Sequence, residues 1–469
     1  MTGVRMPAPH VGGGLPPSRE ASADRHSFSG GGQPAAICRR AEALRLRRTM
    51  HVVLAAVGIL APLSAQSPTL AIVGGTVYPV SGPRIEKATV LVRDGRIAAV
   101  GANVTVPADA QRIEAAGKWI TPGLINVVSV LGLVEVRLSG GATDEAARGT
   151  NNIAAAFRPW EALDAASPLF AATRNDGITT VGVLPSGNLI AGQHALIDLV
   201  DGPGQTMLRK APSAMVAQIE SAAPAGVGSR GELIGKLRTL LDDAREWPAR
   251  RASVEEGRSR PLSAAPADLD ALQPVLAGTL PLLVFADRAA EIDAVLRLAA
   301  DYRIRLILGG AAEAWQRADR LAAAGVPVLV GGIRNIPGSF DQLGSREDNA
   351  ALLRRAGVTV VLVSDSYGDG DHFNVRNVRF EAGNAVANGL PWEEALRALT
   401  AAPAEILGVA DSVGTLQPGR DANLVVWSGD PFEFATVAEA VIIRGTRVDG
   451  PSRQDELMRR YRTLPPTCR

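Results

Sequence analysis

Cysteine, histidine and aromatic residues are all scarce in this chain of 469 residues, and each shortage excludes a class of function. Its two cysteines, Cys38 and Cys468, cannot build a disulfide framework or a thiolate zinc site. Aromatic residues make up only 4% of the chain, which argues against stacking platforms for single-stranded nucleic acid. The net charge of +1 also lacks the basic excess of a nucleic-acid-binding protein. We therefore expect no nucleic-acid partner.

Apolar residues, in contrast, are plentiful. They form 46% of the chain, and the mean hydropathy is +0.09, so a large core is expected and wholesale disorder is excluded. The length suits two or three average domains, or one large barrel with an attachment.

The first 65 residues have the pattern of an export signal. Residues 1–38 are rich in Gly, Pro and Ser, residues 39–48 carry five arginines, and residues 52–63 form an apolar run. The run ends at Leu63-Ser64-Ala65, a small-residue cleavage pattern. It is shorter than the roughly 20 apolar residues that a membrane span needs. We predict a secretory signal, a periplasmic or secreted protein, and no membrane span in the mature chain. Two alternatives stay open: an N-terminal core helix, and a start at Met50.

Cleavage after Ala65 would leave very few thiol and imidazole side chains for metal or acid–base chemistry. The mature chain keeps one cysteine, Cys468, and only two of the five histidines, His194 and His372.

Both ends of the mature chain have the alternating pattern of β-strands. Residues 88–92 and 97–101 flank Asp94-Gly95, which predicts a hairpin with a tight turn. Residues 70–78 precede it, and two further strand candidates lie near the C-terminus, at 422–427 and 441–445.

Short apolar strands alternate with helical segments between these ends. Predicted strands cover residues 178–184, 280–285, 306–308, 326–330 and 358–363, and predicted helices cover 288–299, 313–324 and 392–400. This alternation indicates a parallel α/β architecture, and residues 122–410 suit a (β/α)8 barrel. We interpret residues 203–268 as a barrel helix plus a surface insertion.

Five motifs stand out near the two ends of the chain: Leu70–Thr76 (LAIVGGT), Val92–Ile97 (VRDGRI), Ala116–Ile125 (AGKWITPGLI), Leu396–Leu407 (LRALTAAPAEIL) and Val413–Ala422 (VGTLQPGRDA). Together they resemble the amidohydrolase superfamily, in particular its branch of imidazolonepropionase-related enzymes. The resemblance implies an α/β fold: a distorted (β/α)8 TIM-like barrel plus a small β-sandwich built from both chain ends. The expected parts are a leader and signal peptide (1–65), a β-sandwich (66–121 and 411–450), the barrel (122–410) and a tail (451–469).

The resemblance also implies one or two divalent metals at the barrel mouth, and here the sequence departs from the family. The family's first-strand motif, with two histidines, is replaced by Asn126–Val130, which places Val128 and Val130 at the imidazole positions. Phe285 and Gly309 stand at the positions of the histidines on strands 5 and 6. Only the strand-8 aspartate is kept, as Asp365, and no matching lysine is found on strand 4. The ordinary binuclear metal mechanism is therefore not supported.

Three residues could still form a smaller site at the mouth. His194 is expected in a Gly-rich loop after the second barrel strand, and His372 follows Asp365 closely, so Asp365, His194 and His372 could together hold one metal ion. Asp365 and His372 are also candidates for a metal-free acid and base. The simpler interpretation is two hydrogen-bonded or solvent-facing histidines and a turn aspartate.

Two arginines are candidates for binding a carboxylate-bearing ligand, namely Arg346 and Arg376. The alternative is that both are solvated, and that Asp348 near Arg346 caps a helix that runs to Arg355.

Three functions therefore compete. The first is a hydrolase of carbon–nitrogen (non-peptide) bonds, which the resemblance implies, with one divalent metal such as zinc. The second is an exported pseudoenzyme without metal that binds a small molecule or pairs with an active homologous subunit. The third is a metal-free enzyme that uses Asp365 and His372. A homo-oligomer is compatible with each of them.

Overall fold

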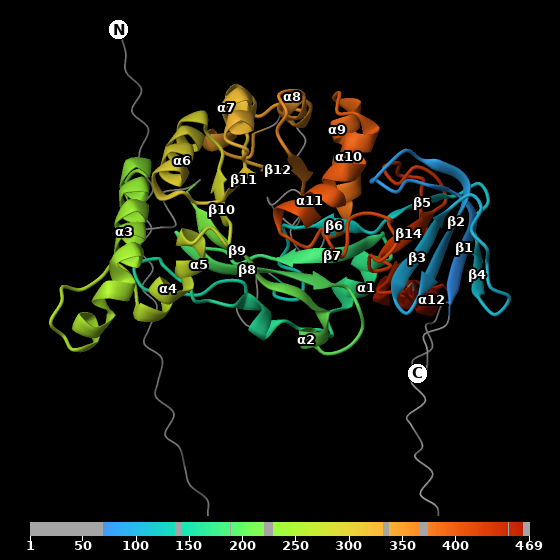
Figure 1. Cartoon of the computed structure of the whole chain (residues 1–469), viewed down its shortest axis with the longest axis horizontal. Coiled ribbons are helices and arrows are strands. Elements are labelled where there is room, and N and C mark those ends of the chain that lie inside the picture. The colour runs from blue at the N-terminus through green and yellow to red at the C-terminus, as the bar shows by residue number, and fades with distance from the viewer. Residues whose placement is uncertain are drawn as a thin grey trace, which may run out of the picture. The chain divides into compact units, whose positions relative to one another are not determined.

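The computed structural model describes residues 69–136, 143–187, 189–219, 228–331, 337–364, 374–448 and 450–462. These residues form two eight-stranded β-sheets with helices around one of them (Figure 1). We call them the barrel sheet and the end sheet. Both predicted parts of the fold, a barrel in the middle and a separate sheet from the chain ends, are confirmed.

The end sheet joins the two ends of the described chain. Its strand order is β16-β15-β14-β5-β1-β2-β3, with β4 paired to β1. The predicted hairpin lies between β2 and β3, and its turn residues Asp94 and Gly95 both have positive φ, as such turns require. The strands are β1 (Leu70–Val77), β2 (Ile85–Arg93), β3 (Arg96–Gly101), β4 (Gln111–Glu114), β5 (Trp119–Pro122), β14 (Leu424–Trp427), β15 (Ala438–Ile443) and β16 (Thr446–Arg447).

The barrel sheet follows chain order from its first strand to its last. Its strands are β6 (Leu124–Asn126), β7 (Ile178–Val183), β8 (Ile190–Asp198), β9 (Leu208–Gln218), β10 (Leu282–Ala286), β11 (Leu306–Gly310), β12 (Val328–Val330) and β13 (Val360–Leu362). β6 and β13 stand at the two ends of this order. The Asn126 side chain joins them, because its Nδ2 donates to Ser364 Oγ, just past β13, over 2.8 Å.

One strand departs from the predicted parallel pattern, because β8 runs antiparallel to both β7 and β9. The expectation of a loop around His194 is therefore wrong. Residues 203–268 do contain the predicted helix, at Arg230–Glu255, but the strand β9 in the same range was not predicted. Every residue of β8 is buried, although it includes Gly192, Gln193 and His194. A strand buried on both faces shows no polar–apolar alternation, which is why the sequence pattern missed it.

Helices pack around the barrel sheet, and α6 to α10 follow its last four strands (Figure 1). The predicted helices are found as α6, as η2 with α7, and as α10. Helical segments are η1 (Pro159–Ala162), α1 (Pro168–Arg174), α2 (Gly204–Met207), α3 (Arg230–Glu255), α4 (Pro266–Ala271), α5 (Gln273–Leu276), α6 (Ala289–Tyr302), η2 (Ala314–Arg317), α7 (Ala318–Ala323), η3 (Phe340–Gln342), α8 (Asn349–Arg355), η4 (Val375–Asn377), α9 (Val378–Ala387), α10 (Trp392–Ala398), α11 (Ala401–Ile406) and α12 (Arg453–Tyr461). Within the described ranges, none of these helices combines the length and the apolar character that crossing a membrane requires.

The barrel interior is a packed apolar core. One side chain from each of several strands meets its neighbours there, including Ile125, Leu196, Leu283, Ile307 and Val361, all at most 2% exposed. Residues of and after α11, among them Ala404 and Leu407, belong to the same cluster. The interior is thus filled by side chains, as in other small barrels.

A buried ion pair connects the barrel sheet to the end sheet. Asp198, at the end of β8, is fully buried and accepts hydrogen bonds from Arg209 Nη2 over 2.5 Å and from Arg444 Nε over 2.7 Å. Thr180 Oγ1 donates to the same carboxylate over 2.7 Å. Arg444 follows β15 of the end sheet, and Arg209 also donates to Asp421 over 3.0 Å. One carboxylate therefore neutralises cations from both sheets.

We expect Asp198→Asn to lower the free energy of unfolding by about 3 kcal/mol, because it leaves two partly buried guanidinium groups without their shared anion. Urea unfolding followed by circular dichroism measures this. The control is Asp201→Asn, which breaks an ion pair with Arg174 whose aspartate is 79% exposed, and should cost less than about 1 kcal/mol. Equal losses in the two variants would contradict the role given to Asp198.

Candidate functional site

Several positions at the carboxyl ends of the barrel strands, where barrel enzymes build their sites, carry apolar side chains in this protein. Val128 and Val130, just past β6, are 0% and 2% exposed, and Phe285 on β10 is 5% exposed. Phe285 pairs in register with Gly309 on β11 and with Gln218 on β9. The side chains at positions 128, 285 and 309 therefore offer no lone pair to a metal, and the residues present do not fit a metal at these three positions.

The Phe285 ring fills the space next to Gly309. A Cβ atom on Gly309 would lie 2.8 Å from two ring carbons of Phe285, closer than carbon atoms approach in proteins. A large side chain on β10 and a missing one on β11 are thus complementary in volume. An imidazole at position 309 has no room while Phe285 occupies this place.

Neutral hydrogen bonds hold the segment that carries Val128. Asn126 Nδ2 donates to Ser364 Oγ over 2.8 Å and to the Val375 carbonyl over 3.1 Å, and its Oδ1 accepts from the Val128 amide over 3.2 Å. Ser364 Oγ in turn donates to the Val128 carbonyl over 3.4 Å. All these groups are buried and none of the side chains carries a charge, so this network is suited to fixing the backbone after β6.

His194 lies beneath that segment, inside the barrel wall. Its side chain is completely buried, with Nδ1 2.6 Å from Ser213 Oγ and Nε2 2.9 Å from the Val127 carbonyl. A carbonyl only accepts, so Nε2 carries the proton and Nδ1 accepts from the serine hydroxyl. Burial lowers the pKa of His194 to about 4, so the ring is neutral at pH 7. Both ring nitrogens are committed, and neither has a lone pair left for a metal in this arrangement.

Gly182 on β7 makes room for this histidine. A Cβ atom there would lie 2.4 Å from His194 Nε2 and 2.1 Å from the Val127 carbonyl oxygen. The contact of β7, β8 and the segment after β6 therefore depends on a glycine and a histidine together, and the imidazole acts as a structural brace.

Two of the other predicted site residues, Asp365 and His372, lie outside the described residues, so their grouping with His194 stays a prediction. Arg346 pairs with Asp348 through two hydrogen bonds of 2.7 and 2.8 Å, and its guanidinium lies 4.8 Å from the centre of the Trp315 ring. Asp348 precedes α8 without a side-chain capping bond, because its carboxylate faces Arg346. In the described ranges, no three His, Cys, Asp or Glu side chains group closely enough to hold a metal.

Arg376 lies in η4 and forms an ion pair of 3.5 Å with Asp176. Asp176 directly precedes β7, at the amino-terminal end of that strand. Burial raises the pKa of Asp176 and the facing arginines, Arg376 and Arg379, lower it by a smaller amount. Arg346 and Arg376 thus have separate partners, and their proposed role in ligand binding stays a prediction.

A buried polar network past the end of β10 was missed by the sequence reasoning. Asp287 is 1% exposed and accepts from the Ala312 amide over 3.2 Å and from Gln342 Nε2 over 3.0 Å. Glu291 is 4% exposed, and Arg230 bridges it to Asp341. Burial raises the pKa of Glu291. The available signal was an aspartate directly after a predicted strand, but its partners come from distant segments that only folding brings together.

A cavity of about 640 Å³ lies beside the carboxyl ends of β7 and β9. Leu189, between β7 and β8, forms part of its wall, and the first half of α3 contributes Glu232, Lys236 and Thr239. Asn151, Asn152 and Ser263 also belong to the polar lining. The Glu232–Lys236 pair is 3.4 Å apart and nearly half exposed, so its charges can be shared with a ligand at little cost.

Known proteins share this architecture. The amidohydrolase family model matches residues 312–451. A solved amidohydrolase from Thermotoga maritima MSB8 superposes with a TM-score of 0.73 at 25% identity, over 81% of this chain and 99% of that one. The imidazolonepropionase of Maricaulis maris (strain MCS10) is 26% identical over 375 residues, which are 73% of this chain and 87% of that protein. This chain belongs to the amidohydrolase superfamily.

A further relative within the superfamily shares only a short stretch. The amidohydrolase tasK of Hapsidospora irregularis is 36% identical over 95 residues, which are 20% of this chain and 9% of that protein. The chain therefore spans under a tenth of this relative, but most of the length of the imidazolonepropionase. The predicted membership in a superfamily of hydrolases is confirmed.

The buried His194 predicts a specific dependence of stability on pH. Its pKa is lowered in the folded state from 6.5 to about 4, so the unfolded chain binds the proton more tightly. The contribution is complete above pH 6.5 and is lost as the pH falls toward 4, by about 3 kcal/mol in total. NMR of ¹³C-labelled histidine should show one ring that stays neutral at pH 5, and this signal should be missing in His194→Gln. A His194 signal that titrates near pH 6.5 would contradict its burial.

The packing of Phe285 on Gly309 predicts that even a methyl group is too large at position 309. We expect Gly309→Ala to lower the free energy of unfolding by about 1–3 kcal/mol, through overpacking. In a Phe285→Ala background the same change should cost nothing or should stabilise the protein. Gly235→Ala is the matched control, because a Cβ there has open space on a helix and should stabilise by about 0.5–1 kcal/mol. Urea unfolding of the wild type, the two single variants and the double variant completes the cycle, and Gly235→Ala is measured beside it.

Proposed function

We propose that this protein is an exported, non-catalytic member of the amidohydrolase superfamily that binds a small polar molecule beside the barrel mouth. The observation that carries the proposal is the packing at the strand ends. Val128 and Phe285 are buried there, and the Phe285 ring occupies the space next to Gly309. Among the described residues, the side chains at positions 128, 285 and 309 supply no donor atoms for the two-metal site that the family resemblance implies, and the Phe285 ring takes up room beside Gly309.

The cavity next to β7 and β9 supports the binding half of the proposal. Its volume of about 640 Å³ is within the range of small-molecule sites. Two asparagine side chains and the Glu232–Lys236 pair line it. The cavity therefore offers hydrogen-bond donors and acceptors and one charge of each sign. A polar ligand that exposes both charges, or amide groups, would match this lining.

Hydrolysis of carbon–nitrogen (non-peptide) bonds with one metal ion is the competing function. Its support is the superfamily itself and the relatives named imidazolonepropionase. It requires Asp365 and His372 to supply the ligands, because both nitrogens of His194 are hydrogen-bonded. A non-catalytic protein could also act as a subunit that pairs with an active homologue, instead of binding a small molecule.

Metal content separates these functions. The full-length chain should be produced with added zinc, manganese and iron, purified, and measured by elemental mass spectrometry. We expect less than about one metal per ten chains, because the strand-end positions 128, 285 and 309 carry no ligand atoms on their side chains. About one metal per chain that is lost in both Asp365→Ala and His372→Ala would overturn the proposal in favour of hydrolysis. Arg346→Gln serves as a control that leaves every candidate ligand in place.

A further inference from the structure

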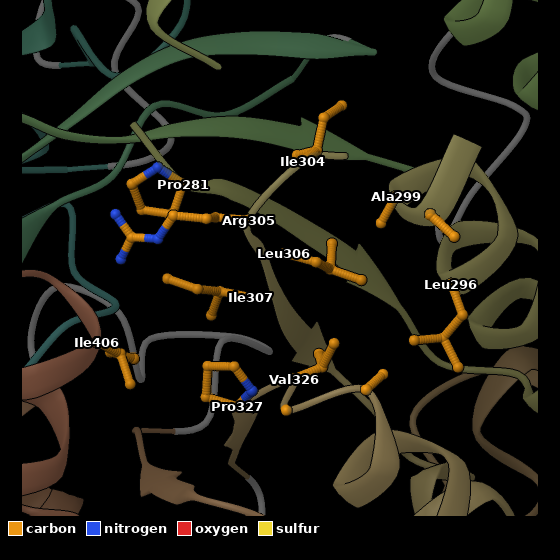
Figure 2. A pocket seen from close by; sticks show the side chains of 13 residues that line it. Pro281, Leu296, Ala299, Ile304, Arg305, Leu306, Ile307, Val326, Pro327 and Ile406 are labelled. Carbon is orange, nitrogen blue, oxygen red and sulfur yellow. The ribbon is translucent and has the colours of Figure 1, made fainter. Parts of the chain in front are cut away.

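A second cavity lies at the opposite end of the barrel, away from the strand ends discussed above. It has a volume of about 490 Å³ and surrounds the amino-terminal start of β11, between the starts of β10 and β12 (Figure 2). The side chains that line it are almost all apolar. The walls are formed by Pro281, Leu296, Ala299, Ala300, Ile304, Leu306, Ile307, Ala324, Gly325, Val326, Pro327 and Ile406, with Arg305 as the sole ionisable residue of the lining.

The cavity exists because β11 and β12 separate at this end. β10 and β11 pair in register from Leu282–Leu306 onward, whereas β11 and β12 pair at Leu308–Val328. The Leu308 amide donates to the Pro327 carbonyl over 3.0 Å. In a parallel ladder the preceding bond would run from the N–H of residue 327 to the Leu306 carbonyl. Proline has no N–H, so Pro327 cannot make that bond, and the gap between the two strands opens there.

The gap connects two differently lined sides of β11. Arg305 and Ile307 extend from one side of the strand, where Pro327 and Ile406 of α11 also lie, and Leu306 extends from the other side (Figure 2). Leu296 and Ala299 of α6 line that other side. An elongated molecule could therefore place one end near Arg305 and the other against α6.

Arg305 is the group that gives the cavity a chemical preference. Its side chain is exposed, and no hydrogen bond or ion pair to the guanidinium is found within the described ranges. Most arginines around the barrel, such as Arg317 with Asp293, are paired. An unpaired guanidinium at one end of an apolar cavity is complementary to a single carboxylate on an aliphatic chain.

We propose that this cavity binds a medium-chain aliphatic monocarboxylate, with its carboxylate on Arg305 and its chain in the gap between β11 and β12. The volume of about 490 Å³ is within the range of small-molecule sites. The site is separate from the barrel mouth and does not depend on the function proposed for the mouth.

The test is isothermal titration calorimetry of the full-length chain with hexanoate, octanoate and 1-octanol. We expect one molecule of octanoate per chain, bound about tenfold more tightly than 1-octanol, because only octanoate can form a charge-assisted bond with Arg305. Each CH₂ from hexanoate to octanoate should tighten binding about fourfold. Absence of saturable octanoate binding, or equal affinity for octanoate and octanol, would overturn the proposal.

Three variants locate the site. Arg305→Gln should weaken octanoate about tenfold and leave 1-octanol unchanged. Ala299→Leu grows into the cavity and should weaken both ligands at least tenfold, with unfolding temperature as the check on its fold. Arg297→Gln, at an exposed position of α6 outside the lining, should change neither affinity. Equal effects of Arg297→Gln and Arg305→Gln, or unchanged binding in Ala299→Leu, would place the ligand elsewhere and contradict the proposal.

Sedimentation of the free protein addresses the other possible occupant of the cavity. We expect the wild-type protein and Ala299→Leu to sediment as the same species. A wild-type dimer that Ala299→Leu dissociates would mean that a second copy of the chain covers this cavity, and would overturn the ligand assignment.

Discussion

The hydrogen bonds and ion pairs of Asp198 join three neighbouring strands of the barrel sheet to Arg444, which lies 246 residues further along the chain. A carboxylate without contact to water is stable only when cations and hydrogen-bond donors replace its hydration. Arg209 from β9, Arg444 after β15 and Thr180 from β7 provide them. Because β8 is antiparallel to its neighbours, its last residue, Asp198, lies at the amino-terminal side of the barrel sheet, where the end sheet can reach it. The unusual direction of one strand thus positions the anion on which both sheets converge.

The described part of the barrel mouth shows how closely the side chains of neighbouring strands can match in volume. In this protein Val128 and Phe285 are buried apolar side chains, and the Phe285 ring occupies the space that the missing side chain of Gly309 leaves. His194 contributes in the same way, because its two hydrogen bonds brace the segment after β6 and its neutral form avoids a buried charge. Such packing stabilises a fold through close contacts that are each sensitive to one methyl group.

The two ends of the barrel therefore differ in what they offer. At the carboxyl ends, side chains and neutral hydrogen bonds fill the space on the axis, and polar groups gather off the axis around Asp287 and in the cavity beside α3. At the amino ends, Pro327 before β12 opens the sheet, and apolar side chains meet Arg305, whose guanidinium has no partner among the described residues. Backbone pairing thus determines the opening at the amino ends.

The sequence by itself determined the superfamily, the barrel between two β-rich ends, the Asp94-Gly95 hairpin and the chemistry that positions 128, 285 and 309 lack. These features depend on local patterns and on the kinds of side chain present, which can be seen without coordinates. The direction of β8, the location of β9 and the structural role of His194 were decided by the tertiary structure. A strand buried on both faces carries no alternation to identify it, and the partners of His194, Asp198 and Asp287 come from segments that only folding brings within hydrogen-bonding distance. The tertiary structure also decided the fit of Phe285 against Gly309 and the gap that Pro327 opens beside Leu306. Both depend on the register between neighbouring strands, which the sequence of one strand does not specify.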